Sequence, residues 1–505
     1  MLKERASGIL LHPTSLPGKY GIGTLGKEAF DFIDFLVKAK QQYWQILPLG
    51  PTGFADSPYQ CFSAHAGNPN LIDFDLLVKQ KLLHPDDLAD YPSFGDGAVQ
   101  YEAVQKARLP LLRKAFQSFL MYADNMEKMA YRTFLKEQSK WINDYALFRA
   151  IKANRGQRPW YEWEPELKRG DEEAVKAIQT TLHDEINFYK FQQFLFFRQW
   201  FAVKDYAHKN KIKIIGDIPL YIALDSADAW SNPEFFEFDA NLNPIRVGGV
   251  PPDYFSETGQ LWGNPLFRWD TLKETGYQWW CERIRTSLLL YDIIRIDHSR
   301  GFASYWAVPF EEKTAINGQW IEGPGKDFFE AMRREFGELP IIAEDLGVIT
   351  PEVEDLRDSF GFPGMKILEF AFDSSEANDY IPHNYTRNFI VYTGTHDNDT
   401  VVGWFQKASA ADQKHVIDYI GYNQQDIQWP FIRLAWASVA NTAIIPLQDL
   451  LGLDSAGRMN LPGTTESNWQ WRAKKSDFQH ELAENLAHLT VLYGRTKKIK
   501  SKSQV

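Results

Sequence analysis

The sequence predicts an α/β protein built as a (β/α)8 TIM barrel. Along its 505 residues, eight short apolar runs rich in β-branched residues alternate with segments of helical periodicity, and each run ends in polar residues. Eight units in a β-then-α order favour a closed barrel of parallel strands surrounded by helices. An open, doubly wound sheet is the alternative, because a count of strands does not prove closure. No Walker-type loop follows any run, which weakens a nucleotide-binding interpretation.

The eight strands are expected at residues 7–12, 43–50, 212–222, 292–297, 339–345, 364–373, 389–397 and 441–449. Between the first two, Ala29, Phe30, Ile33, Leu36 and Val37 recur at helical spacing, which indicates a βαβ unit. A long amphipathic segment then precedes the third strand.

The helix expected before the fifth strand illustrates the local signals. Asp327 and Glu330 are spaced as a capping box at its start, and Gly337 is expected to end it. The chain therefore carries start and stop signals as well as periodicity.

Two long intervals predict insertions into a single catalytic domain that spans residues 1–505. Residues 51–211 are too long for one crossover and are expected to form a mostly helical subdomain. Residues 221–270 are dense in Gly, Pro, Asn and aromatic residues, and we expect an active-site loop insertion after strand three. The chain ends soon after its eighth unit, so a separate C-terminal β-domain is not expected.

Composition narrows the class of protein. The chain is 44% hydrophobic and 24% charged with a net charge of −11, so we expect no nucleic-acid partner and no membrane partner. The N-terminal stretch lacks a signal-peptide core, and no run of about 18 apolar residues predicts a membrane span. Two cysteines provide no disulfide framework. These observations predict a cytoplasmic protein.

Acidic residues directly follow four of the apolar runs: Asp217, Asp297, Glu344 and Asp397. Strand ends open onto one face of a barrel, so the four carboxylates should share a pocket. Taken singly, each could be an ordinary helix N-cap, and this structural alternative is strongest for Asp217 and Asp345. Taken together with Arg295, His298 and His396, the set favours a functional site, because crowded carboxylates perturb one another's pKa.

Several carboxylates beside Arg and His in an aromatic-rich chain suit retaining glycoside chemistry. One carboxylate attacks the anomeric carbon while an acid about 5 Å away protonates the leaving oxygen. Metal-dependent barrel chemistry is the competing interpretation, but the sequence has no early His-x-His and no His-x-x-x-His pair. A non-catalytic glycan-binding protein would need the aromatic residues but not the aligned acids.

The same motifs resemble a known family over nearly the whole chain. The segments around strands four, five and seven are IIRIDHSRGF, IIAEDLG and TGTHDNDT, and others are GILLHPTSLPGKYGIGTLG, DSPYQCFSAHAGNP, GDIPLYIALDSADAW and GVPPDYFSETGQLWGNPLFRW. They are similar to the 4-α-glucanotransferases called amylomaltase or disproportionating enzyme, a branch of the α-amylase superfamily.

The resemblance implies three catalytic residues. Asp297 would be the nucleophile that forms a glycosyl-enzyme, Glu344 the general acid and then base, and Asp397 the stabiliser of the transition state. Arg295 would hold Asp297 in its ionised form.

The resemblance also implies a substrate-binding set. His396 and Asp217 would contact the sugar at the cleavage point, and Tyr59 would stack on a glucose ring. Alternatively, Tyr59 is a loop aromatic residue that only fills the contact between subdomains. His298 would either bind substrate or only brace the nucleophile. Acceptor subsites would be lined by Asp253, Tyr254, Phe255 and Trp262 of the long loop, although that loop could equally be structural packing.

The activity implied is transfer of α-1,4-glucan segments from one maltodextrin, amylose, starch or glycogen-type chain to the 4-hydroxyl of another glucan or of glucose. An α-1,4-glucan hydrolase that uses the same residues with water as acceptor is the alternative. No organic cofactor and no metal is implied.

Overall fold

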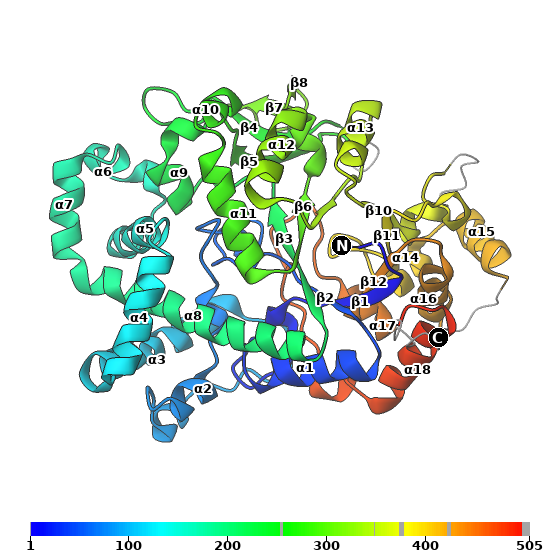
Figure 1. Ribbon diagram of the computed structural model, residues 1–505, viewed down its shortest axis with the longest axis horizontal. Helices are drawn as coiled ribbons and strands as arrows, with labels where there is room; N and C mark the ends of the chain where they lie inside the picture. The colour runs from blue at the N-terminus through cyan, green and yellow to red at the C-terminus, as the bar shows by residue number, and fades with distance from the viewer. Residues whose placement is uncertain (1, 253–255, 348, 373–377, 422–425, 497–505) are drawn as a thin grey trace, which may run out of the picture.

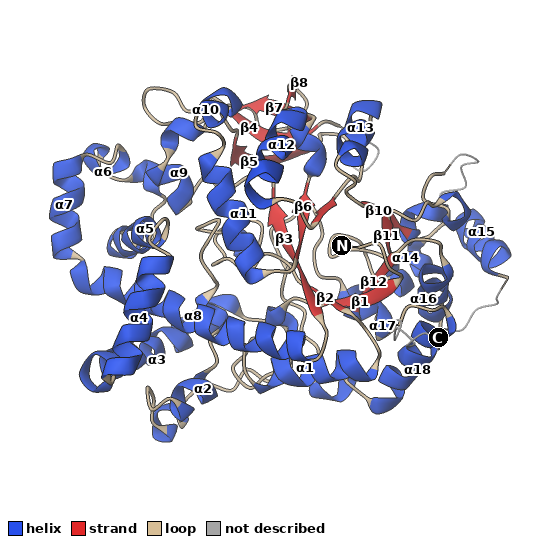
Figure 2. Ribbon diagram, in the orientation of Figure 1, coloured by secondary structure: helices blue, strands red, loops and turns tan. Residues whose placement is uncertain are grey.

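The computed structural model describes residues 2–496 except 253–255, 348, 373–377 and 422–425. Its centre is an eight-stranded parallel barrel encircled by helices (Figures 1 and 2). The strands are β1 (Ala6–Leu10), β2 (Tyr43–Gln45), β3 (Lys213–Pro219), β6 (Ile293–Asp297), β9 (Ile341–Ala343), β10 (Gly364–Ile367), β11 (Phe389–Tyr392) and β12 (Thr442–Pro446). Each falls within a predicted run or overlaps its edge, and the predicted barrel is confirmed.

The strands follow one another around the ring in chain order, with β12 paired to β1. Strands β10 and β9 are the first and last strands in the hydrogen-bonded order of the sheet. The backbone N–H of Ala343 in β9 donates to the carbonyl of Pro363, next to β10, at 3.0 Å. This link closes the barrel, so the open-sheet alternative is wrong.

Strand β6 shows why an apolar strand carries charges. Its side chains alternate between the barrel interior and the helix layer, as in any strand. Ile294 and Ile296 belong to the large core under the helices, whereas Ile293 belongs to the interior core. Arg295 and Asp297 continue the interior row toward the carboxyl end of the strand. The charged residues therefore emerge into the mouth of the barrel.

Helices between the strands cover the outside of the barrel. They include α1 (Lys27–Lys38), α8 (His183–Lys209), α11 (Gln278–Leu290), α12 (Gly325–Phe336), α13 (Pro351–Ser359), α14 (Val401–Lys407), α15 (Ala410–Ile420), α16 (Gln428–Ala437), α17 (Leu447–Leu450) and α18 (His480–Leu492). In α1 the buried face includes Phe32 and Phe35, which pack on Phe478, while Val37 of the predicted stripe is exposed. The stripe is thus rotated toward α18.

The predicted capping box before β9 is wrong. Helix α12 begins at Gly325, three residues earlier than a box with Asp327 as N-cap requires, and no side chain caps it. Asp327 instead accepts a hydrogen bond from the Tyr277 hydroxyl at 2.8 Å. Gly337 does end the helix, with a φ of 74° that favours glycine.

The interval between β2 and β3 is largely helical and extends to one side of the barrel (Figure 1). It contains α2 (Phe74–Lys79), α3 (Tyr101–Tyr122), α4 (Asn125–Glu137), α5 (Ile142–Asn154), α6 (Pro165–Lys168), α7 (Glu172–Thr181) and α8. Helix α8 contacts α5 in this group and also α1 and β3, so it joins the helical group to the barrel.

The loops after β3 and β6 combine into a second sheet. The first loop supplies α9 (Ala227–Ser231), β4 (Arg246–Val250) and β5 (Gln260–Pro265), followed by α10 (Trp269–Glu274); the second supplies β7 (Ser304–Pro309) and β8 (Gln319–Glu322). The four strands pair in the antiparallel order β5-β4-β7-β8. This sheet lies beyond the carboxyl ends of β3 and β6, near the top of Figure 1.

A buried arginine ties the end of the described chain to the barrel. The Arg495 guanidinium is fully buried and donates to the carbonyl oxygens of Ala6, Ala435, Trp436, Ser438, Ala440 and Asn441. These carbonyls come from the start of β1, from the last turn of α16 and from the segment between α16 and β12. One side chain therefore joins the end of α16 to the start of β1 and to the residue before β12.

Arg495→Ala should lower the free energy of unfolding by about 3 kcal/mol, because buried carbonyl groups lose their donors and a cavity forms. Urea titration followed by circular dichroism measures this. The matched control is Arg132→Ala on the exposed surface of α4, which should change stability by less than about 0.5 kcal/mol. Equal midpoints for the two variants would contradict the assignment.

Candidate active site

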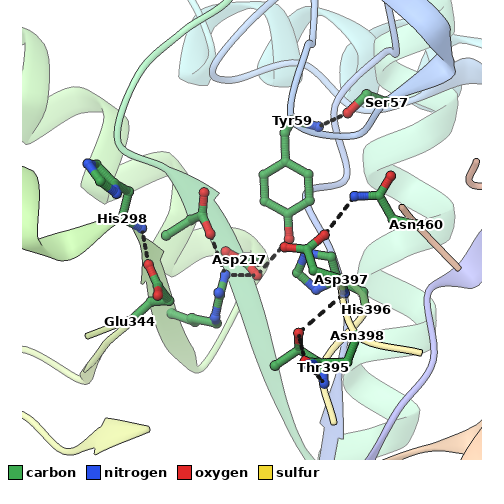
Figure 3. Close-up of polar contacts among 12 residues, drawn as sticks. Ser57, Tyr59, Asp217, His298, Glu344, Thr395, His396, Asp397, Asn398 and Asn460 are labelled. Carbon is green, nitrogen blue, oxygen red and sulfur yellow. Dashed lines mark hydrogen bonds and ion pairs between the residues drawn. The ribbon is translucent and has the colours of Figure 1, made fainter. Parts of the chain in front are cut away.

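The acidic residues predicted to converge do so at the carboxyl ends of the barrel strands (Figure 3). Asp217 lies in β3 and Asp297 ends β6, while Glu344 follows β9 and Asp397 follows β11. Strands β3 and β6 are neighbours, as are β6 and β9. The parallel order of the strands thus brings together side chains that are far apart in the sequence.

Arg295 is the cation at the centre of this group. Its Nη1 donates to Asp217 Oδ2 at 2.6 Å and to Asp297 Oδ1 at 3.0 Å. Asp217 and Arg295 are paired in register across β3 and β6, and both side chains are buried. Burial raises the pKa of the Asp217 carboxyl, and the guanidinium opposes this rise. The predicted contact between Arg295 and Asp297 is present, and the same guanidinium nitrogen also bonds to Asp217.

Two backbone amides hold Glu344. The N–H of His298 donates to Oε2 at 2.6 Å and the N–H of Leu346 donates to Oε1 at 2.9 Å. His298 reaches this position in the left-handed region, with a φ of 53°. Burial raises the pKa of Glu344 to about 8, and the charge of Asp297 adds to the rise while Arg295 opposes it. Glu344 can therefore carry a proton at neutral pH.

Ser299 fixes the main chain at the same point. Its Oγ donates to the Glu344 carbonyl at 2.8 Å, and its N–H donates to the same oxygen at 3.2 Å. The turn after β6 is thereby tied to the turn after β9.

Asp397 is more open to solvent than the other acids. Its side chain is 43% exposed, compared with 29% for Asp297. Oδ2 lies 3.4 Å from His396 Nε2, and Oδ1 accepts a hydrogen bond from Asn460 Nδ2 at 2.7 Å. Burial lowers the pKa of His396, so its ring is neutral at pH 7. The carboxylate thus faces the mouth of the barrel with one oxygen already bonded.

Tyr59 joins the two sides of the site. Its ring stacks on His396 with 5.1 Å between centroids and 19° between planes, and its hydroxyl donates to Asp217 Oδ2 at 3.0 Å. Trp469 packs against both rings. One face of Tyr59 is therefore covered by His396.

Trp262 of β5 packs edge-to-face on His298, with 4.8 Å between ring centroids. Burial lowers the pKa of His298 to about 3, so this ring is also neutral at pH 7. The guanidinium of Arg300 lies over Trp320, 4.1 Å from the ring centroid. The predicted acceptor residues Asp253, Tyr254 and Phe255 lie outside the described residues.

Asp345 has a structural role, but it is not the helix N-cap that the sequence allowed for, because the next helix, α13, has Thr350 at its N-cap. Its Oδ2 accepts a hydrogen bond from Arg357 Nη1 at 2.6 Å, and its Oδ1 accepts one from the Met365 N–H at 2.7 Å. These bonds connect β9 to α13 and β10. Asp345 therefore braces the barrel wall beside Glu344.

Arg458 and Asn460 contact Asp397 and were missed by the sequence analysis. They lie in an irregular segment after β12, where neither periodicity nor a strand end marks a residue. Their bonds to Asp397 are tertiary contacts, which the spacing of residues in the sequence does not reveal.

Within the described residues, no three His, Cys, Asp or Glu side chains are grouped so that they could hold a metal ion. None of the helices in this part of the chain is long and apolar enough to cross a membrane. The polar groups at the barrel mouth instead bond to one another and to backbone amides.

Fold and site together define a (β/α)8 enzyme of the carbohydrate-active kind, with an ion-paired carboxylate, a buried acid and a solvent-facing carboxylate at the strand ends. A family model described as 4-alpha-glucanotransferase matches residues 11–477. The 4-alpha-glucanotransferase of a Synechocystis species is 52% identical over 98% of this chain and 99% of its own length. That of Thermus thermophilus is 46% identical over 94% and 96%.

Solved structures agree. Amylomaltase from Streptococcus agalactiae in complex with acarbose superposes with a TM-score of 0.95 at 42% identity, covering 98% of this chain and 100% of that one. Amylomaltase from Corynebacterium glutamicum, at 18% identity and a TM-score of 0.79, shares the fold. The chain belongs to the 4-alpha-glucanotransferase family. The resemblance and the transferase activity predicted from the sequence are confirmed, and transfer is favoured over hydrolysis.

Arg295→Met should destabilise the protein more at pH 8 than at pH 5. Without the guanidinium, the folded-state pKa of buried Asp217 rises further above its unfolded value of about 4. A carboxyl with a raised folded-state pKa holds a proton that the unfolded chain releases, so stability falls as pH rises between the two pKa values. The expected loss at pH 8 is about 3 kcal/mol.

Urea titrations of the wild type and Arg295→Met at both pH values test this. Arg132→Met on the exposed face of α4 is the control and should show a small loss that is the same at each pH. A loss for Arg295→Met that does not change with pH would mean that the guanidinium acts through packing and not through charge.

Proposed function

We propose that this enzyme moves α-1,4-glucan segments by a retaining double displacement at Asp297 and Glu344. The observation that carries the proposal is the contrast between these two acids on the neighbouring strands β6 and β9. Asp297 is partly exposed and bonded to a guanidinium, whereas Glu344 is buried and has a raised pKa. Such a contrast divides the roles of nucleophile and acid in retaining glycoside chemistry.

In the first displacement, a carboxylate oxygen of Asp297 attacks the anomeric carbon of the sugar at the cleavage point. The bond to the leaving glucan breaks, and its oxygen takes the proton of Glu344. The donor segment is then held as an ester on Asp297. Arg295 favours the carboxylate form of Asp297 through the 3.0 Å hydrogen bond.

In the second displacement, the Glu344 carboxylate removes the proton from the 4-hydroxyl of an incoming glucan or glucose. The hydroxyl oxygen attacks the anomeric carbon, Asp297 leaves, and Glu344 regains its proton. Two inversions give retention. Water in place of the sugar hydroxyl would give hydrolysis with the same residues, which is the second candidate activity.

Asp397 and His396 would bind hydroxyls of the sugar at the cleavage point. The exposed carboxylate supplies acceptors, and the neutral imidazole supplies one donor. Hydrogen bonds that strengthen as positive charge develops on the sugar lower the barrier. Asp217 is fully buried under Tyr59, so it supports this subsite chiefly through Arg295 and the Tyr59 hydroxyl.

Aromatic residues would bind the neighbouring sugars. Tyr59 beside His396 would stack on one sugar, and Trp262 beside His298 would line the acceptor side. Asp253, Tyr254 and Phe255 are proposed to complete that side. Residues 221–270 would then act as an active-site insertion, and 51–211 as a mostly helical one, in a single catalytic domain.

The substrates are proposed to be maltodextrin, amylose, starch or glycogen-type α-1,4-glucans, with glucose as the smallest acceptor. The support is the family membership together with acarbose in the Streptococcus agalactiae amylomaltase structure. A cytoplasmic location is proposed, supported by the two free cysteines, Cys61 and Cys281.

Incubation with maltotriose tests the reaction class. Transfer should give a ladder of longer and shorter maltodextrins. Chromatography of samples taken over time measures these products. Asp297→Asn should lower turnover by about 10⁴-fold or more, because the glycosyl ester cannot form, with its circular dichroism spectrum unchanged. Formation of glucose and maltose without longer products would show hydrolysis. Turnover by Asp297→Asn at the wild-type rate would show that Asp297 is not the nucleophile.

The pH dependence of kcat/KM tests Glu344. The acid must be protonated for the first displacement, so activity is present below its pKa and falls as pH rises through about 8. The decline should approach tenfold per pH unit. A maltosyl donor whose leaving group needs no proton is the control, and this alkaline limb should be absent from its first step. An equal limb with both donors would contradict the role of Glu344.

A further inference from the structure

A short segment after β12 holds Asp397, which follows the neighbouring strand β11. Asn460 Nδ2 donates to Asp397 Oδ1 at 2.7 Å (Figure 3), and Arg458 Nη2 donates to the Asp397 carbonyl at 2.6 Å. One bond acts on the side chain and the other on the main chain. Both the position of the residue and the rotation of its carboxylate are therefore defined from residues 458–460.

Residues 458–460 are themselves fixed by hydrogen bonds. Arg458 Nε donates to the Asn460 carbonyl at 2.7 Å, so the two donors form one unit. The N–H of Trp469 donates to the Met459 carbonyl at 2.8 Å. The N–H of Leu461 donates to Asn468 Oδ1 at 2.9 Å. The donors are thus fixed in the protein before a sugar arrives.

The carboxylate of an aspartate needs such a donor. Rotation about the bond to a carboxylate is broad and has no sharp minima, unlike rotation between tetrahedral carbons. Asp397 is 43% exposed, so packing alone does not fix the rotation. With Oδ1 bonded to Asn460, Oδ2 lies beside His396 Nε2 at 3.4 Å and is the oxygen available to a ligand.

We propose that Asn460 is a positioning residue for the transfer reaction. It holds Asp397 so that Oδ2 meets the sugar at the cleavage point, and Arg458 sets the main chain beneath it. This inference rests on the proposed role of Asp397 and deepens it. Asn460 acts through Asp397, which separates its effect on turnover from that of a residue needed only for folding.

Asn460→Asp is the informative variant, because its effect should depend on pH. Above the pKa of the new carboxyl, two carboxylates repel and the hydrogen bond is lost. Below it, the protonated carboxyl can donate to Asp397 as the amide did. Partial burial and the neighbouring carboxylate raise the pKa of the new group, while Arg458 opposes the rise and neutral His396 lies beyond Asp397.

The measurement is kcat and KM for maltotriose from pH 5 to pH 8, expressed as the ratio of variant to wild type. We expect kcat about 10- to 100-fold below wild type at pH 8, with KM changed less than about threefold. The kcat ratio should recover at least about fivefold by pH 5. Asn125→Asp, an exposed change of the same charge at the start of α4, should show a ratio near one throughout.

A ratio for Asn460→Asp that is flat across this range, or a kcat equal to wild type, would overturn the proposal. If that variant does not accumulate as folded protein, Asn460→Ala removes the donor without adding charge. Its kcat should fall about 10- to 100-fold at every pH, and a wild-type kcat would overturn the proposal equally.

Asp397→Asn in the same assay separates this inference from the proposed function. Turnover at the wild-type level in Asp397→Asn would remove the stabilising role of Asp397 itself. An inactive Asp397→Asn beside a fully active Asn460→Ala would leave that role in place and reject only the positioning by Asn460.

Discussion

The buried guanidinium of Arg295 is the interaction on which the site depends. It neutralises Asp217 at 2.6 Å and reaches Asp297 at 3.0 Å, so one cation serves a fully buried acid and a partly exposed one. Because Asp217 and Arg295 face each other across β3 and β6, the pairing register of these strands fixes the distance between the charges. A shift of one residue would move the charges into the apolar helix layer. The catalytic geometry is in this sense a property of the barrel register.

The local environment gives chemically similar side chains different properties in this site. Glu344 is kept from water and held by two backbone amides, whereas Asp397 faces the solvent and is oriented by side chains from a distant segment. His298 and His396 are both neutral because they are buried, so they enter the site as hydrogen-bonding and stacking groups and not as charges. Arg295 is the cation bonded to the carboxylates of Asp217 and Asp297, whereas Arg458 bonds to the main chain of Asp397.

The sequence predicted the features that follow from regular periodicity. The eight apolar runs predicted the barrel. The positions of Asp217, Asp297, Glu344 and Asp397 near the ends of these runs predicted that the four side chains lie close together, because the carboxyl ends of parallel strands meet at one edge. Features that arise from tertiary contact escaped it. Asn460 lies 63 residues beyond Asp397 in an irregular segment. Asp327 has the spacing of a capping residue but bonds to Tyr277 instead, because the helix begins earlier. The sheet that pairs β4 with β7 joins two loops whose short strands carry no signal of their partner.

That second sheet has a consequence for loop exchange between related enzymes. Strands β4 and β5 come from the loop after β3, which carries Trp262, and β7 and β8 come from the loop after β6. Replacement of either loop alone would leave β4 or β7 with unpaired backbone groups along one side, and exposed strand edges promote aggregation. The two loops therefore form one transplantable module, and chimaeras that aim to change which acceptor is used should move residues from both together.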